Sequence, residues 1–248
     1  MKKLLLATTT LVAFAVGAQA ADLGVPRSPV AAAVVAPAFN WTGFYVGGSI
    51  GYWTSAMDVR DPVVGAATSG RPNPNGVKIG AHIGYLNQFA NNFVLGIEGD
   101  LSWLGGASRN GAIAGFPGQF WRARGSYDAS LRGIAGVAAD RALIYVTGGL
   151  ALADFQGCGL VGVGTPCVAG TTFGGVRAGW TVGAGVAYAI TQNVSVRGEY
   201  LYADYGSKTS AMPANPSGLG RVQASTHTVR LGLSYHFSTG PSAVVARY

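Results

Sequence analysis

The last part of the chain alternates apolar and polar residues with a period of two. In residues 226–237 (THTVRLGLSYHF) the apolar positions are Val229, Leu231, Leu233, Tyr235 and Phe237. Side chains on a strand point alternately to its two faces, whereas a helix with about 3.6 residues per turn would spread these positions around its surface. The pattern therefore predicts a β-strand with one apolar face.

The same alternation predicts seven earlier strands, at residues 41–52, 77–86, 93–104, 126–138, 142–155, 177–190 and 194–205. Their connections alternate in length. Residues 87–92, 139–141 and 191–193 are short, whereas 53–76, 105–125, 156–176 and 206–225 are long. Short turns at one rim and long loops at the other are typical of bacterial outer-membrane barrels. We expect the long loops to be extracellular and both termini to be periplasmic.

The alternation does not say which face meets lipid, because a soluble lipocalin-like barrel alternates with its apolar residues inside. Here the polar face is mostly Gly, Ala, Ser and Thr, which suits the crowded interior of an eight-stranded barrel. Aromatic residues near strand ends on the apolar face are typical of membrane interfaces. They are Phe44, Tyr52, Phe93, Trp103, Tyr127, Trp180, Tyr188, Tyr235 and Phe237. We predict an all-β fold, an eight-stranded antiparallel up-and-down transmembrane β-barrel.

Composition supports this fold class. Charged residues make up 11% of the chain, against about 25% in ordinary soluble domains. Outside the first 20 residues no stretch has about 18 consecutive apolar residues, so no helical membrane span is expected. Dispersed apolar residues are instead the pattern of a membrane barrel.

The ends of the chain are expected to be separate segments. Residues 1–20 read as a signal peptide, with Lys2 and Lys3, an apolar run and an A-x-A cleavage site; a short membrane anchor is the alternative. Residues 21–38 form an Ala/Pro-rich segment, residues 39–237 the barrel and residues 238–248 a tail. Removing the two lysines lowers the formal charge from +7 to +5, which does not indicate nucleic-acid binding.

Several stretches resemble one family. They are FNWTGFYVGGSIGY (39–52), NFVLGIEGDLSW (92–103), YVTGGLALA (145–153), GWTVGAGVAYAITQNVSVRGEYLYADYG (179–206) and HTVRLGLSYHF (227–237). The chain is similar in them to the small outer-membrane immunogenic proteins of alphaproteobacteria, often labelled porin-family or OmpA-like barrels. Arg230, Gly232, Tyr235 and Phe237 also resemble the closing-strand signal that the outer-membrane barrel assembly machinery recognises. The resemblance implies that machinery as a partner, and in some relatives haemin binding.

Eight charged residues fall on the predicted inward face. They are Lys78, Arg132, Arg197 and Arg230, with Glu98, Asp100, Asp128 and Glu199. Unpaired buried charge costs several kcal/mol, so we expect these side chains to form ion pairs that plug the lumen and fix strand register. A selectivity ring in a narrow pore is the alternative, and it requires a continuous water path.

The three histidines are candidates for haem or metal ligation, because imidazole serves both. His82 and His236 are expected to point inward, and His227 near the long-loop rim is the best single haem candidate. No pair has the spacing of a metal motif, so lone structural histidines are the simpler interpretation, and we assign no metal and no cofactor. A lipid hydrolase would need Ser, His and an acid to converge, which the sequence does not indicate; we assign no catalytic residue.

The long loops carry two further features. Cys158 and Cys167 share the third long loop, and an even cysteine count in an oxidising compartment predicts a disulfide there. Five loop cations could contact lipopolysaccharide phosphates at the cell surface, although ordinary solvated charge is the alternative. They are Arg109, Arg122, Arg124, Lys208 and Arg221.

Together these patterns predict a surface-exposed, structural outer-membrane protein that contributes to envelope integrity and is not an enzyme. Its expected partners are outer-membrane lipids and lipopolysaccharide. Haemin capture or a narrow pore is the main alternative function, and an outer-membrane lipid hydrolase is the second.

Overall fold

The computed structural model describes residues 39–63, 65–71, 73–105, 108–113, 117–169, 172–211 and 219–238. The predicted signal peptide and N-terminal segment lie outside these ranges, and so does the predicted tail after Ser238. These three remain predictions. Within the described ranges, no helix is long and apolar enough to cross a membrane.

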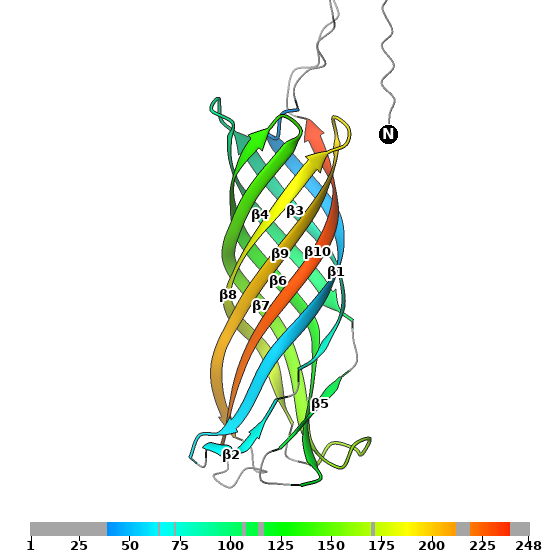
Figure 1. The fold of residues 1–248 in the computed structure, drawn as a ribbon, viewed down its shortest axis with the longest axis vertical. Helices are drawn as coiled ribbons and strands as arrows, with labels where there is room; N and C mark the ends of the chain where they lie inside the picture. Colours follow the sequence, from blue (N-terminus) through cyan, green and yellow to red (C-terminus); the bar gives the residue numbers. More distant parts are fainter. Residues whose placement is uncertain are drawn as a thin grey trace, which may run out of the picture. The chain divides into compact units, whose positions relative to one another are not determined.

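Eight antiparallel strands form a closed ring (Figure 1). They are β1 (Gly43–Asp61), β3 (Asn75–Gln88), β4 (Phe93–Leu104), β6 (Gln119–Ala139), β7 (Ala142–Val161), β8 (Phe173–Ala189), β9 (Val194–Ala211) and β10 (Leu219–Ser238). Each strand pairs with the next in sequence, and β1 pairs with β10 from Gly43↔Ser238 to Arg60↔Arg221, which closes the ring. The predicted fold class is confirmed.

Two short strands stand outside the ring and were not predicted. Strand β2 (Gly65–Gly70) pairs with the end of β1, and β5 (Arg109–Ala112) pairs with the start of β6. Figure 1 shows both at the long-loop end of the barrel, opposite the short turns. Two of the short turns use Asn92 (φ 63°) and Asp140 (φ 53°) in the left-handed region, which Asn and Asp adopt more readily than most residues.

The predicted apolar faces all point outward. Ile50 is 57% exposed and Leu231 is 62% exposed in the isolated chain, whereas their neighbours Ser49 and Arg230 are buried. On β4 this face runs from Phe93 to Trp103, which at a rise of about 3.3 Å per residue and a tilt of about 40° covers about 25 Å. That height matches the hydrocarbon layer, so the lipocalin-like arrangement is excluded.

Most of the predicted strand ends at the long-loop rim were wrong, whereas β4 ends at Leu104 as predicted. Strand β1 continues past Tyr52 to Asp61, and β6, β7, β9 and β10 likewise extend into segments that were expected to be loops. In these extensions the polarity of the two faces is exchanged. On β1 the buried residues are now Trp53, Met57 and Val59, whereas Ala56 and Arg60 are exposed. The barrel wall therefore continues beyond the lipid belt with a polar exterior and an apolar interior.

The barrel interior has three layers. At the short-turn end, an apolar cluster includes Phe39, Trp41, Leu86 and Leu143. Charged side chains fill the middle. Toward the long-loop end, the second apolar cluster comprises Trp53, Met57, Val59, Leu104, Trp121, Ala123, Ala151, Ala153, Phe155, Ala203, Tyr205, Val222 and Ala224. Side chains occupy the interior at all three levels, in keeping with the narrow diameter of an eight-stranded ring.

Adjacent glycines on β7 provide a test of this packing. A Cβ added to Gly149 would lie 2.1 Å from the carbonyl oxygen of Leu131, whereas at Gly148 the nearest heavy atom would be 3.5 Å away. We expect Gly149→Ala to lower the free energy of unfolding by about 1–3 kcal/mol through overpacking, and Gly148→Ala to leave it close to wild type. The measurement is the midpoint temperature of the folded-to-unfolded mobility shift on gels. Equal midpoints for the two variants would contradict this account of the wall.

Candidate functional site

Six charged side chains meet in the middle of the lumen. This lumen ion network consists of Glu98, Asp100, Arg132, Arg197, Glu199 and Arg230, each with a side chain no more than 5% exposed. The residues come from β4, β6, β9 and β10, so the network crosses the barrel from wall to wall.

Glu98 lies at the centre of the network. Its carboxylate accepts hydrogen bonds from Arg132, from Arg197 (Nη2–Oε1 3.1 Å) and from the Tyr45 hydroxyl (2.7 Å). Arg230 is 3.4 Å from the same carboxylate. Three guanidinium groups therefore surround one carboxylate.

The other two carboxylates balance the remaining positive charge. Glu199 accepts from Arg132 (2.9 Å) and from Arg230 (2.7 Å). Asp100 lies 3.1 Å from Arg132 and 3.3 Å from Arg230, and it also accepts from the Ser130 hydroxyl. Each arginine of the network thus contacts at least one carboxylate.

Lys78 and Asp128 form a separate ion pair nearby. All eight predicted lumen residues therefore take part in ion pairs, four cations with four anions. Pairing of this kind offsets the desolvation that an isolated charge would suffer in the lumen. Glu98 faces Arg132 and Glu199 faces Arg230 across neighbouring strands. These ion pairs therefore join neighbouring strands in the observed register.

Glycines make room for the arginines. Arg230, Arg132 and Arg197 lie opposite Gly51, Gly149 and Gly232 on neighbouring strands. A Cβ at Gly51 would come within 2.7 Å of the Arg230 Cβ, and one at Gly232 within 3.0 Å of the Arg197 side chain. The small residues on the inward face thus define where the large ones fit.

The short-turn side of the network is closely packed. A cavity lined by residues that include Trp41, Tyr145, Arg197 and His236 has a volume of about 20 Å³, room for about one water molecule. The indole N–H of Trp41 and the hydroxyl of Tyr145 have no partner among the described residues, and such a water would satisfy them.

Two histidines pair with serines inside the barrel. His82 Nε2 lies 2.8 Å from the Ser234 hydroxyl, and His236 Nε2 lies 2.8 Å from the Ser195 hydroxyl. All four residues are buried. His82 Nδ1 has no partner within the described part of the chain, so no acid orients that imidazole as a hydrolase triad requires.

His227 lies on the outward face of β10. Its Nδ1 is 2.7 Å from the Tyr200 hydroxyl, and its ring is 5.1 Å from that of Tyr202. His227 therefore belongs to the aromatic interface, whereas His82 and His236 are buried inside the barrel. Across residues 39–238 where they are described, no three His, Cys, Asp or Glu side chains are grouped to hold a metal ion.

The five predicted loop cations lie at the long-loop end, four of them exposed and Arg122 half-buried, and they fall into two groups. Arg109, Arg122 and Arg124 lie on β5 and β6, whereas Lys208 and Arg221 lie on β9 and β10. Arg109 and Arg122 donate to Asn75 (3.2 Å) and Asn110 (3.3 Å). Arg124 has no hydrogen bond or ion pair with any residue that the structure describes.

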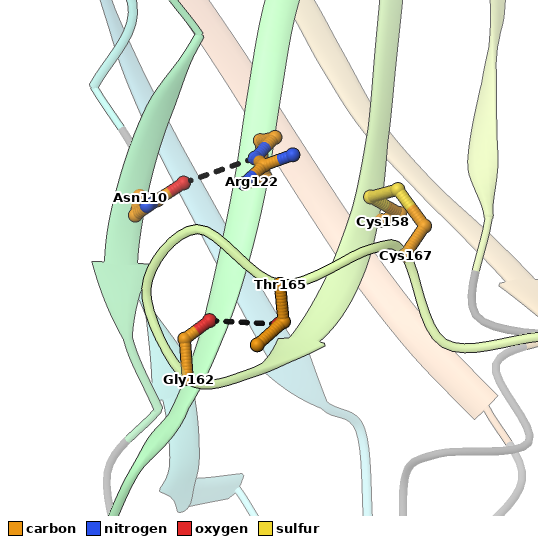
Figure 2. Close-up of a disulfide and its surroundings, with 6 residues drawn as sticks. All are labelled: Asn110, Arg122, Cys158, Gly162, Thr165 and Cys167. Atoms are coloured by element: carbon orange, nitrogen blue, oxygen red, sulfur yellow. Dashed lines mark hydrogen bonds between the residues drawn. A yellow bond between two sulfur atoms is a disulfide. The ribbon is translucent and has the colours of Figure 1, made fainter.

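A disulfide bond joins Cys158 to Cys167, as predicted (Figure 2). It closes the turn that follows β7, in which the Thr165 hydroxyl donates to the Gly162 carbonyl (2.9 Å) and Val168 N–H donates to the Gly159 carbonyl (3.0 Å). Cys158 is itself a residue of β7, so the bond ties the loop to the barrel wall.

Sequence reasoning did not assign Tyr45 or Ser130 to the network, although both lie on inward faces. Their partners come from strands far away in sequence, so periodicity alone could not join them. It also missed the apolar cluster at the long-loop end. The signal for that cluster was present, because Trp53, Met57 and Val59 continue the alternation of β1 with exchanged polarity.

Comparison with known proteins places the chain among membrane barrels. Residues 6–237 match the sequence profile of the family described as outer membrane protein beta-barrel domain. The 31 kDa outer-membrane immunogenic protein of Brucella melitensis biotype 1 is 35% identical, over 96% of this chain and all of the relative. The 22 kDa outer membrane protein of Rhizobium leguminosarum bv. viciae is 33% identical, over 83% of this chain and 82% of the relative.

Among solved structures, the outer membrane protein OprG of Pseudomonas aeruginosa has a TM-score of 0.52 and 12% identity, covering 81% of this chain and 99% of OprG. That likeness concerns the fold. With the profile match and the relatives of similar length, it confirms the resemblance inferred from the strand sequences. The chain belongs to the outer membrane protein β-barrel domain family, and it is a protein of the outer membrane.

Proposed function

We propose that the protein is a structural, non-conducting barrel of the outer membrane that contributes to envelope integrity. The lumen ion network carries this proposal, since it crosses the barrel with side chains no more than 5% exposed. The apolar clusters on either side of it leave the charges no aqueous path to either rim. A selectivity ring would instead need hydrated charges.

We further propose how the barrel is oriented in the outer membrane and which partners it contacts. The strand extensions and long loops face the cell exterior, and the short turns face the periplasm, as in other bacterial barrels. The exposed cations Arg109, Arg124, Lys208 and Arg221 contact lipopolysaccharide. Arg230, Gly232, Tyr235 and Phe237 on β10 form the signal for the barrel assembly machinery, with Tyr235 and Phe237 presented on the outward face.

Catalysis finds little support in this geometry. The serine hydroxyls that meet histidines are buried in the lumen, where a lipid substrate has no access. The names of the relatives point the same way, because the Brucella protein is called an outer-membrane immunogenic protein. The protein therefore acts through its structure and its exposed surface.

Conductance is the direct test of a plugged lumen. We expect the purified protein, refolded in planar bilayers, to show no reproducible open-channel steps, because the network and both apolar clusters fill the ring. A general-diffusion porin reconstituted in the same way is the positive control. Reproducible large open channels at low protein density would reject the plug and favour the pore.

The structural role of the network predicts a large effect of Glu98→Gln. Losing this carboxylate leaves three guanidinium groups short of a partner, so we expect the free energy of unfolding to fall by about 3–5 kcal/mol. Urea unfolding in lipid vesicles measures it.

The matched control is Asp58→Asn, which removes the acid of the Asp58–Arg60 pair on the strand extension. Hydrogen bonds from Arg60 lower the pKa of Asp58, but the pair is solvent-screened and contributes little. We expect the control to unfold like wild type. Equal stability of Glu98→Gln and wild type would mean that the network does not hold the barrel together.

Haemin capture is the second candidate, and the Tyr200–His227 hydrogen bond favours it, because metal-bound histidines usually bond through their other nitrogen. If the protein has only a structural role, haemin titration of wild type and of His227→Phe gives the same Soret spectrum. A Soret shift that wild type shows and the variant lacks would establish capture at His227.

A further inference from the structure

A polar pocket of about 420 Å³ lies on the outside of the barrel, just beyond the lipid belt. Its lining includes Trp103, Arg124, Ser126, Tyr127, Asp154 and Gln156. Trp103 and Tyr127 are paired interface aromatics, 52% and 57% exposed. Because such aromatics mark the depth of lipid headgroups, an occupant of this pocket would lie at headgroup depth.

The pocket exists because the barrel wall is interrupted there. Pairing between β4 and β6 ends at Trp103↔Tyr127, and pairing between β5 and β6 begins only at Arg109↔Ala123. The register between β6 and β7 also shifts between Gly125 and Asp128. A β-bulge of this kind redirects side chains and is frequent at barrel rims and binding sites.

The back of the pocket is closed toward the lumen. A Cβ added to Gly125 would lie 2.8 Å from Leu104 and 3.0 Å from Trp53. Both side chains belong to the apolar cluster at the long-loop end of the interior. The pocket is therefore a surface site open to the lipid headgroups and not an entrance to the lumen.

Two charged groups in the pocket are available to a ligand. The Arg124 side chain is exposed and has no partner in the described ranges, whereas the Ser126 hydroxyl, although unpartnered, is buried and inaccessible. Asp154 accepts a hydrogen bond from the Gln156 side chain (3.0 Å) but makes no ion pair with Arg124. A cation and an acceptor thus face one volume without neutralising one another.

We propose that this pocket binds the phosphorylated sugar headgroup of lipopolysaccharide, with a phosphate at Arg124. The guanidinium group suits a phosphate because it can donate two parallel hydrogen bonds. Asp154 accepts from a sugar hydroxyl, a contact that a phosphate alone would not make. The inference rests on the proposed orientation, which places this rim in the outer leaflet.

The test compares lipid A carrying its phosphates with lipid A from which they have been removed, each added to the detergent-purified full barrel. Native mass spectrometry measures the bound fraction. We expect Arg124→Gln to weaken binding of phosphorylated lipid A by about tenfold or more, as the loss of a charge-assisted contact implies. Removing the phosphates should weaken binding to wild type by a similar factor.

Arg122→Gln is the matched control. Arg122 lies two residues away on the same strand, also faces outward and carries the same charge, but its guanidinium donates to Asn110 (Figure 2). We expect its affinity to stay within about twofold of wild type, because a charge outside the pocket lining acts only through screened attraction. The gel mobility shift verifies that both variants are folded.

Three outcomes would overturn the inference. They are equal losses for Arg122→Gln and Arg124→Gln, equal binding of dephosphorylated lipid A, and equally tight binding of a zwitterionic phospholipid. None of these affects conductance or the Glu98→Gln result, so the inference can fail while the plugged barrel stands.

Discussion

The hydrocarbon layer offers no water to the peptide backbone, so every N–H and C=O group that crosses it must pair within the protein. Here β1 and β10 meet that requirement by pairing over almost their whole length, which leaves no open edge in the membrane. Eight strands leave an interior just wide enough for side chains. Closure of the backbone therefore fixes the lumen width, and the lumen width forces the inward side chains to pack.

Packing in so narrow a space depends on pairing large residues with small ones. Arg132, Arg197 and Arg230 each lie opposite a glycine of the next strand, and the glycines have no side chain that would compete for the lumen. The guanidinium groups can then reach carboxylates on other strands. The high glycine content, 39 residues, follows in part from this requirement.

Periodicity predicted the eight strands, the outward faces and the eight paired charges, because each of these depends on which face a residue occupies. It could not predict the partners within the network. Arg197 contacts Glu98, which is 99 positions away, and such contacts depend on strand register and barrel closure. The strand extensions were missed for a different reason. At Tyr52 and Trp53 the apolar residues move from the outward face to the inward face. A strand predicted from one unbroken apolar face therefore ends there.

That change of face has a consequence for the surface of the protein. Beyond the lipid belt the wall has an apolar interior, as a soluble protein does, and it continues there as paired strands. The cations on β5, β6, β9 and β10 are therefore held on strands, at defined heights above the aromatic interface. Rigid placement matters because a flexible side chain on a flexible loop loses more entropy when it binds. Arg124, on the wall next to an interruption, is the cation among them that lines the pocket proposed for a headgroup.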